Sequence, residues 1–272
     1  MLKPVVSAVC LALVGLSFAL APLRAQQPIN DALAAEKLPS FEVASIKPSD
    51  PDDRGLKLRT SADRVTIENF TLKELIAYAY DLKSDSQVLS GPDWLDKKHF
   101  DIAAKVDDIE LAKLKTMRGN EIRNEWRQMM QSLVIDRFAL KVRLDRRAIP
   151  VFALVVVKSG QKLTPAKAKE TYSLSARNSH LSATAVSMAH FADFLTGQDE
   201  TNDRVVVDRT GLTGDFDFKL DWAPDNGNGI PPDAQLPGLL TALHDQLGLQ
   251  LKPDKAAVDV VVVESVKEPE VD

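Results

Sequence analysis

The chain has 272 residues, of which 44% are hydrophobic, and its 34 basic and 39 acidic side chains give a formal net charge of −5 at pH 7. This mildly acidic balance argues against a nucleic-acid or anionic-membrane partner, because both attract basic surfaces. The length is sufficient for one large or two small domains.

Residues 1–25 have the pattern of an export signal. Lys3 gives a positive start, an apolar run from Val5 to Leu20 follows, and Ala25 provides the small residue of a cleavage site. A membrane anchor is the alternative, but the run is shorter than the ~20 residues of a span, and no later stretch is long and apolar enough. Cys10 is the only cysteine. Because Cys10 lies within the signal, cleavage would remove it. The exported chain, periplasmic or extracellular, would therefore contain no disulfide and no thiol nucleophile.

Residues 26–40 are polar and alanine-rich, as expected of a flexible leader, and the first module then begins. Phe41–Ile46 alternates as a strand does, residues 49–63 are typical of a surface loop, and residues 64–67 are typical of a short strand. Thr71 and Glu74 have the spacing of a capping box, and the apolar residues after Thr71 recur at helical spacing. The sequence therefore predicts a helix here, followed by an alternating strand at 99–106.

The rest of this module is expected to hold one more helix and two more strands. A charged stretch from Asp107 to Asn124 precedes an apolar stripe from Trp126 to Val134, which predicts the helix. Residues 138–144 and 151–157 predict the two strands. Residues 159–177, rich in Lys, Ala, Ser and Thr, are interpreted as a linker.

The chain after this linker matches the chain before it. Phe216-Asp217-Phe218 aligns with Phe100-Asp101-Ile102 at an offset of 116 residues (216 − 100 = 116), and the match continues upstream without a gap. Ser187 falls where Thr71 does, again before a helical stripe. Further on, a helix at 239–247 and strands at 247–251 and 258–263 match at an offset of 109 (249 − 140 = 109). We interpret this pattern as an internal duplication.

These elements predict an α+β fold made of two tandem related modules, residues 41–158 and 178–268. Each module is expected to run strand-helix-strand-helix-strand-strand, with its helices packed on small mixed sheets.

Several segments between residues 41 and 266 form a specific set. They are Phe41–Pro48, Gly91-Pro92 with Trp94, Asp136–Phe138 with Leu140–Val142, Pro150–Val156, Val207–Gly214 with Phe216–Phe218, and Gln246–Leu249. With them the chain resembles a family of exported proteins of unknown function that is expanded in soil-associated bacteria. The resemblance implies export and a duplicated layout, but no reaction and no catalytic residues. Residues 107–124 depart from the family pattern because they are longer and more charged. In element order alone, each half also resembles the small α+β modules at the periplasmic mouths of secretins and TonB-linked receptors.

Side chains that carry metal or nucleophilic chemistry do not form a motif. The histidines His99, His180, His190 and His244 have no metal-ligand spacing, and neither a nucleophile elbow nor a phosphate-binding glycine loop occurs. We therefore expect no metal and no cofactor.

Asp101 and Asp217 occupy equivalent positions in the two modules. If the modules pack about a pseudo-twofold axis, the two carboxylates would meet as an acid–base pair. The structural alternative is that each aspartate points away from the neighbouring apolar side chains, toward solvent or a helix N-terminus.

The segment Val207–Gly214 has two glycines, two threonines and an Asp-Arg pair, which is typical of a tight turn. One interpretation is structural: the glycines adopt positive φ, and Asp208 or Thr210 caps the turn. The other is a ligand-facing loop in which Arg209 binds a carboxylate or phosphate.

From these patterns we expect a non-enzymatic module that binds a peptide, a glycan or another envelope protein, with exposed strand edges available for pairing. One alternative is a hydrolase in which Asp101, Asp217, Arg137, Arg209 and Trp94 face a cleft between the modules. Another is a structural assembly unit. A deep cleft with converging polar groups would favour the hydrolase, and a smooth junction would favour the binding module.

Overall fold

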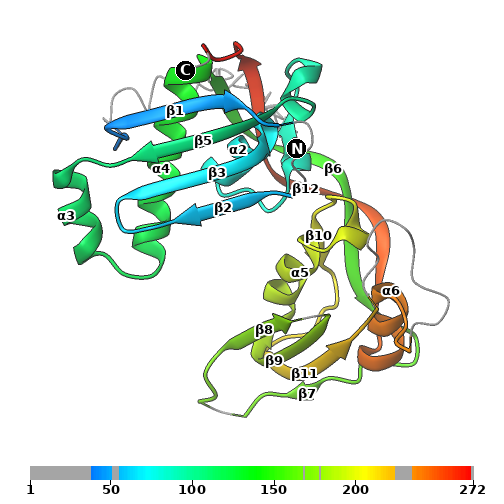
Figure 1. Cartoon of the computed structure of the whole chain (residues 1–272). Helices are drawn as coiled ribbons and strands as arrows, with labels where there is room; N and C mark the ends of the chain where they lie inside the picture. The colour runs from blue at the N-terminus through cyan, green and yellow to red at the C-terminus, as the bar shows by residue number, and fades with distance from the viewer. Residues whose placement is uncertain (1–37, 51–54, 168, 178, 224–234, 271–272) are drawn as a thin grey trace, which may run out of the picture.

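The computed structural model describes residues 38–50, 55–167, 169–177, 179–223 and 235–270. In these residues, strands form three four-stranded sheets with helices packed beside them, so the fold is mixed α+β, as the sequence predicts. Figure 1 shows two of the sheets at opposite ends of the molecule. Two long strands, β6 (Lys141–Val156) and β12 (Leu249–Ser265), run between these ends. The predicted export signal and most of the predicted leader lie outside the described residues.

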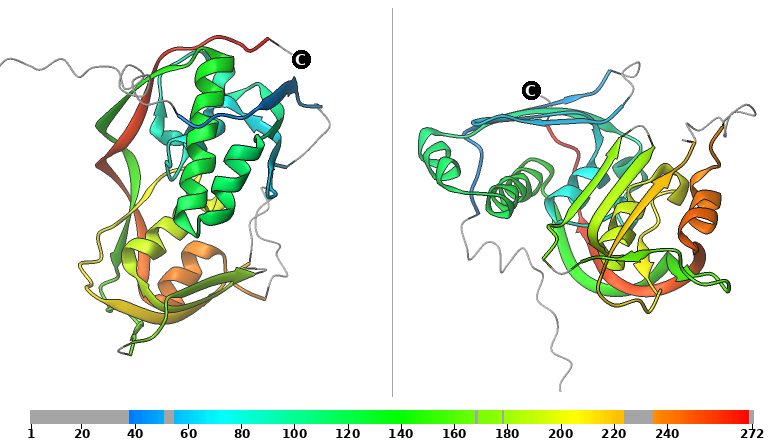
Figure 2. Two further views of the ribbon diagram at one scale, coloured as in Figure 1. Left: turned by 90° about the vertical axis from the view of Figure 1, so that its left-hand side faces the viewer. Right: turned by 90° about the horizontal axis from the view of Figure 1, so that it is seen from below.

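The first sheet is antiparallel and has the order β1-β5-β3-β2. Its strands are β1 (Val43–Pro48), β2 (Lys57–Thr60), β3 (Arg64–Thr71) and β5 (His99–Lys105). The helices beside this sheet are α2 (Leu72–Ala79), α3 (Asp108–Thr116) and α4 (Asn120–Phe138). We call this sheet and its helices the first half, and the third sheet with its helices the second half. Figure 2 shows α3 beside α4. Sheet and helices together bury one hydrophobic cluster, in which Ile67, Ile102 and Phe138 are almost fully buried. β2 lies in the stretch that the sequence indicated as a loop.

Three short elements connect α2 to β5. They are the 3-10 turn η1 (Asp85–Gln87), strand β4 (Val88–Leu89) and the 3-10 turn η2 (Asp93–Asp96).

The third sheet, at the other end, has the order β7-β11-β9-β8. Its strands are β7 (Thr164–Pro165), β8 (Ser173–Arg177), β9 (His180–Ser187) and β11 (Asp215–Asp221). Helix α5 (Met188–Thr196), helix α6 (Leu239–Ala242) and the π-helical turn η4 (Leu243–Leu247) complete this half, with the 3-10 turn η3 (Asp199–Thr201) after α5. The segment interpreted as a linker, 159–177, thus supplies the two edge strands of this sheet.

The two ends of the molecule share part of their element order and the spacing of two strands, although α3 and η2 of the first end have no counterpart among the described elements of the second. β3 and β9 begin 116 residues apart (180 − 64 = 116), and so do β5 and β11 (215 − 99 = 116). Each strand before the first helix ends in a hydroxyl cap: Thr71 Oγ1 accepts the Glu74 N–H, and Ser187 Oγ accepts the His190 N–H. The predicted capping box is confirmed, because the Glu74 carboxylate also accepts the Thr71 N–H at 2.7 Å.

The long strands correct the sequence prediction. β6 and β12 each run through two segments that were expected as separate strands, and they pair antiparallel from Lys141 opposite Ser265 to Val156 opposite Leu249. We call this pair the ribbon. Pro150 does not break β6, for a geometric reason. The Phe152 N–H donates to the Val205 carbonyl, on the side of β6 that is away from β12. The backbone nitrogen of every second residue points to that side, and Pro150, two residues before Phe152, is one of them. A proline there removes no hydrogen bond of the ribbon.

The ribbon forms the centre of the second sheet, which has the order β10-β6-β12-β4 and connects the two ends of the molecule. In this sheet β10 (Val206–Asp208) pairs parallel with β6, and β4 pairs parallel with β12. β6 begins among the buried side chains of the first cluster and ends in the second, whereas β12 runs the opposite way. A third, smaller cluster that includes Ile149, Val205 and Val260 is buried at the middle of the ribbon. Figure 2 shows the ribbon curving from one half to the other. None of the helices in the described ranges is long and apolar enough to cross a membrane.

Candidate functional site

A cleft of about 760 Å³ lies between the two halves, against the ribbon. The first half contributes residues 80–83 and Gln87, from the segment that follows α2. The ribbon contributes residues 144–146 and 257–260, and the second half contributes one side of α5 and residues 205–208. Residues of both halves are therefore needed to form this cleft.

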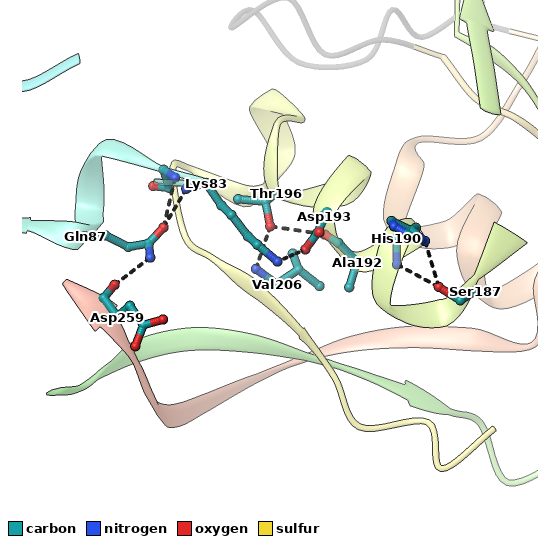
Figure 3. Close-up of polar contacts among 10 residues, drawn as sticks. Lys83, Gln87, Ser187, His190, Ala192, Asp193, Thr196, Val206 and Asp259 are labelled. Carbon is teal, nitrogen blue, oxygen red and sulfur yellow. Dashed lines mark hydrogen bonds and ion pairs between the residues drawn. The ribbon is translucent and has the colours of Figure 1, made fainter. Parts of the chain in front are cut away.

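One wall is the segment after α2, which bridges the two halves. Gln87 is buried and organises it: its side-chain oxygen accepts the backbone N–H groups of Lys83 and Ser84, at 2.9 and 3.1 Å. Its Nε2 donates to the Asp259 carbonyl on β12 at 2.7 Å (Figure 3). The Lys83 ammonium then forms an ion pair with Asp193 on α5, as Figure 3 also shows.

The opposite wall is held by a buried hydroxyl. Thr196 Oγ1 accepts the Val206 N–H at 2.9 Å and donates to the Ala192 carbonyl at 3.1 Å, which fixes α5 to β10 (Figure 3). All three residues are buried, so both hydrogen bonds are shielded from water. The side of α5 that lines the cleft, with Ala189, Ala192 and Asp193, is therefore held in place.

The lining combines aliphatic side chains with five carboxylates, four of which are engaged by neighbouring side chains and one of which, Asp259, is exposed. The aliphatic members include Leu82, Leu144, Val207 and Val258. The four engaged carboxylates are Asp81 with Arg127 at 2.6 Å, Asp145 with Arg143 at 2.9 Å and Arg147 at 2.8 Å, Asp193 with Lys83, and Asp208 with Thr210 at 2.7 Å. The hydrogen bonds from Arg143 and Arg147 hold the pKa of Asp145 well below its usual range.

Tyr80 is the aromatic residue of the lining. Its hydroxyl is buried and has no hydrogen-bond partner among the residues that the structure describes. Burial raises the pKa of Tyr80 to about 12, so its hydroxyl stays protonated at neutral pH.

The structure does not bring Asp101 and Asp217 together, because β5 and β11 lie in sheets at opposite ends of the molecule (Figure 1). Each carboxylate instead holds a bulge in the neighbouring strand. Asp101 Oδ1 accepts the Asn69 N–H at 2.9 Å, and Asp217 Oδ1 accepts the Ala185 N–H at 2.8 Å. Asn69 and Ala185 have φ of 62° and 49°, and the strand register shifts beside each of them. Both aspartates therefore act on the backbone just before a helix.

Arg137 and Trp94 also lie outside the cleft lining. Arg137 is at the end of α4, where its Nη1 donates to the Ala44 carbonyl of β1 at 2.8 Å. Trp94 lies in η2 and packs against the first hydrophobic cluster. Both side chains support the first half of the fold.

The turn after β10 has the structure that its sequence indicates. Asp208 Oδ1 accepts the Thr210 N–H at 2.8 Å, and Gly211 and Gly214 have φ of 69° and 88°. Of the six candidate residues named from the sequence, Asp208 is the one that lines the cleft, whereas the exposed Arg209 does not.

The described residues contain no group of three or more His, Cys, Asp or Glu side chains that could hold a metal ion. Ser187 Oγ and His190 Nδ1 are 3.0 Å apart at the start of α5 (Figure 3). The same hydroxyl accepts the His190 N–H, so this pair forms a helix cap, with His190 in the place that Glu74 has in the first half.

The cleft residues Lys83, Gln87, Asp193 and Asp259 were not found from the sequence, because no motif links positions so far apart. The alignment of the two matching segments did contain one indication of Lys83 and Asp193. At the offset of 116, Lys83 aligns with Asp199 and Asp193 aligns with Ala77, so both lie where the two matching segments differ in charge.

Comparisons with known proteins place the chain in a family without assigning an activity. A search of curated proteins found no match, and a search of solved structures found none. A family model described as "Protein of unknown function (DUF3738)" matches residues 73–266. These residues include both walls of the cleft and the whole ribbon, and the chain belongs to this family of proteins of unknown function, DUF3738.

Proposed function

We propose that this protein is an exported, non-enzymatic binding module that holds an extended peptide segment of an envelope partner between its two halves. The cleft is the observation that carries this proposal. Its volume of about 760 Å³ is within the range of ~300–1,000 Å³ that is typical of ligand sites. Sites of this kind commonly lie between domains.

The lining favours a peptide over a glycan. Leu82, Leu144, Val207 and Val258 offer aliphatic contacts suited to peptide side chains, and Tyr80 is the single aromatic ring beside them.

A cleft with polar groups is also what the hydrolase alternative requires, but the chemistry of its groups favours binding. A general base should have a pKa near the working pH, whereas the two arginines beside Asp145 lower the pKa of that carboxyl. Asp81, Asp193 and Asp208 are each held by a cation or a hydroxyl. The fifth carboxylate of the lining, Asp259, is exposed rather than enclosed with a second polar group. Asp101, Asp217, Arg137, Arg209 and Trp94 do not line the cleft.

The ribbon edges are poorly suited to strand addition. The outward backbone groups near the cleft have local partners: Gln87 Nε2 binds the Asp259 carbonyl, and Asp145 Oδ1 accepts the Arg146 N–H at 2.8 Å. Pro150 and Pro253 have no N–H to donate. Edge strands that are blocked in this way resist pairing with another chain, which leaves side-chain contacts in the cleft as the mode of binding.

An internal duplication and export are parts of the same proposal. The partly shared element order and the offset of 116 in both strand pairs support the duplication, and the pattern of residues 1–25 supports export. Duplicated halves that share a ribbon would form a cleft at their junction without needing a further domain.

Site-specific photo-crosslinking tests the proposal. A photoreactive amino acid replaces Leu144, which is 44% exposed in the cleft, or Ile109, which is 82% exposed on α3 and serves as the control. The probes are a labelled library of unstructured decapeptides and, separately, labelled glycan fragments. We expect peptide crosslinks at position 144 and not at 109, with loss of the crosslinks when Val258→Trp fills the cleft. Equal labelling at both positions, or labelling by glycans alone, would refute the peptide proposal.

A further inference from the structure

The cleft is spanned by contacts that leave from two adjacent residues of the first half. The Lys83 ammonium binds the Asp193 carboxylate on α5, and the Ser84 hydroxyl donates to the Asp203 carbonyl beyond η3. Both contacts are polar. Among the described residues, the ribbon with its flanking strands β10 and β4 and the small third cluster also connect the halves.

This arrangement allows the two halves to move relative to each other. Domains within a chain are expected to move unless the interface between them is large and hydrophobic. Here the third cluster lies at the ribbon, on the floor side of the cleft, whereas Lys83 and Asp193 join the walls. Separation of the walls would break the polar contacts and leave the ribbon paired.

We propose that Lys83 and Asp193 form a clasp that holds the two walls of the cleft together and that must open before a partner enters. The inference rests on the proposed function only in taking the cleft as the binding site. The clasp itself is a property of the free protein. A cationic side chain on the partner would be able to replace Lys83 at Asp193 and so keep the clasp open.

The strength of the contact suits a reversible clasp. The side chains of Lys83 and Asp193 are 51% and 40% exposed, and an exposed ion pair changes an equilibrium by about two- to fivefold. Such a pair is weakened by salt, because mobile ions screen it. The clasp is therefore labile enough to open without disturbing either hydrophobic core.

The clasp has no equivalent at the aligned positions of the two matching segments. At the offset of 116, the counterparts of Lys83 and Asp193 are Asp199 and Ala77, which cannot form an ion pair. This difference distinguishes the contact from the caps and bulges, which occur in both halves and support the fold.

The clasp is tested by chemical access to the cleft, without any ligand. In a Cys10→Ser background, Val258→Cys places a thiol in the cleft, and Ala112→Cys on exposed α3 is the matched control. The probe is a maleimide carrying a polyethylene glycol chain. With Lys83→Glu, we expect the reaction rate at position 258 to rise about fivefold, because glutamate repels Asp193, with no change at position 112. The exchanged pair Lys83→Glu with Asp193→Lys should restore the slow rate.

A salt titration keeps the test decisive if a variant folds poorly. In the chain with intact Lys83 and Asp193, the rate at position 258 should rise with salt concentration, while the rate at position 112 should not. A rate at position 258 that is insensitive to Lys83→Glu or to salt would overturn the clasp. Since the rate is measured without a partner, this result is independent of the peptide crosslinking at Leu144.

Discussion

The carboxylates of Asp101 and Asp217 each compensate for an irregularity in a neighbouring strand. A bulge leaves a backbone N–H that the ladder does not use, and here the aspartate accepts it from Asn69 or Ala185. The bulge lies directly before the helix cap at Thr71 or Ser187. Aspartate at this position therefore helps to set the direction in which each helix leaves its sheet.

Removal of either carboxylate should destabilise the fold. We expect Asp101→Ala and Asp217→Ala each to lower the free energy of unfolding by about 1–3 kcal/mol, because a part-buried N–H loses its acceptor. Chemical denaturation measures the change. Asp136→Ala, at an exposed site on α4, is the control and should stay within about 0.5 kcal/mol. Equal effects at all three sites would contradict the bulge role.

Among the elements, the pair α3 and α4 contains a buried group whose protonation affects stability. Lys113 of α3 forms ion pairs with Glu110 at 3.5 Å and with Glu125 of α4, and both carboxylates are largely buried. Burial, followed by the proximity of Glu125, raises the pKa of Glu110 above its usual 4.5, although Lys113 opposes the shift. The folded state therefore holds a proton at Glu110 at pH values where the unfolded state has lost it.

The sign of this effect gives a pH-dependent prediction. A raised carboxyl pKa stabilises the folded state fully below pH 4.5, and this contribution is lost as the pH rises through the higher folded-state pKa. Glu110→Gln removes the titration, so its stability relative to the natural chain should increase from pH 4 to pH 7. Urea denaturation at both pH values measures this, and Glu121→Gln at an exposed site should show no such trend.

The two residues that lead into the long strands offer a matched pair of substitutions. Ala139 precedes β6 and Gly248 precedes β12, and both have positive φ, at 45° and 67°. A side chain at position 248 would also overlap the Gly160 carbonyl. We expect Gly248→Ala to cost about 2 kcal/mol or more, whereas Ala139→Gly should be neutral or stabilise by about 0.5 kcal/mol, because it relieves a left-handed alanine. Thermal denaturation of both variants measures the change in stability. A similar loss of stability in both would contradict this prediction.

At the scale of the whole molecule, the ribbon makes the two halves one folding unit. β6 and β12 each contribute buried side chains to the clusters of both halves, as Val142 with Leu154 and Leu249 with Val263 illustrate. Neither half can lose its core without loss of a strand that the other half also uses. The halves should therefore unfold together, even though the cleft separates their walls.

Calorimetry tests this cooperativity. Phe138 and Phe191 are fully buried, one in each of the two larger clusters, and each change to alanine should cost about 3–5 kcal/mol. We expect a single transition in the natural chain and in both variants, shifted to lower temperature. Two transitions, of which each variant shifts only one, would show that the halves unfold independently.

The elements that were predicted correctly are those with local causes. The capping box at Thr71, the cap at Ser187 and the strands around Phe100 and Phe216 depend on residues close in sequence. The division of β6 and β12 into separate strands was wrong, because the polar residues between the apolar runs continue the pairing of the ribbon, which the local pattern does not show. The role of Asp101 and Asp217 also required the position of the adjacent strand.

The sequence by itself determined the α+β class, the helix starts at Thr71 and Ser187, the alternating strands and the equal spacing of the two matching segments, because each follows from local capping, periodicity and identity. Only the tertiary structure decided that β6 pairs with β12, that the aspartates lie far apart, and that Lys83 meets Asp193 across 110 residues. These contacts depend on how the sheets are placed by the ribbon. No local pattern carries that information, and the cleft exists only once both halves are assembled.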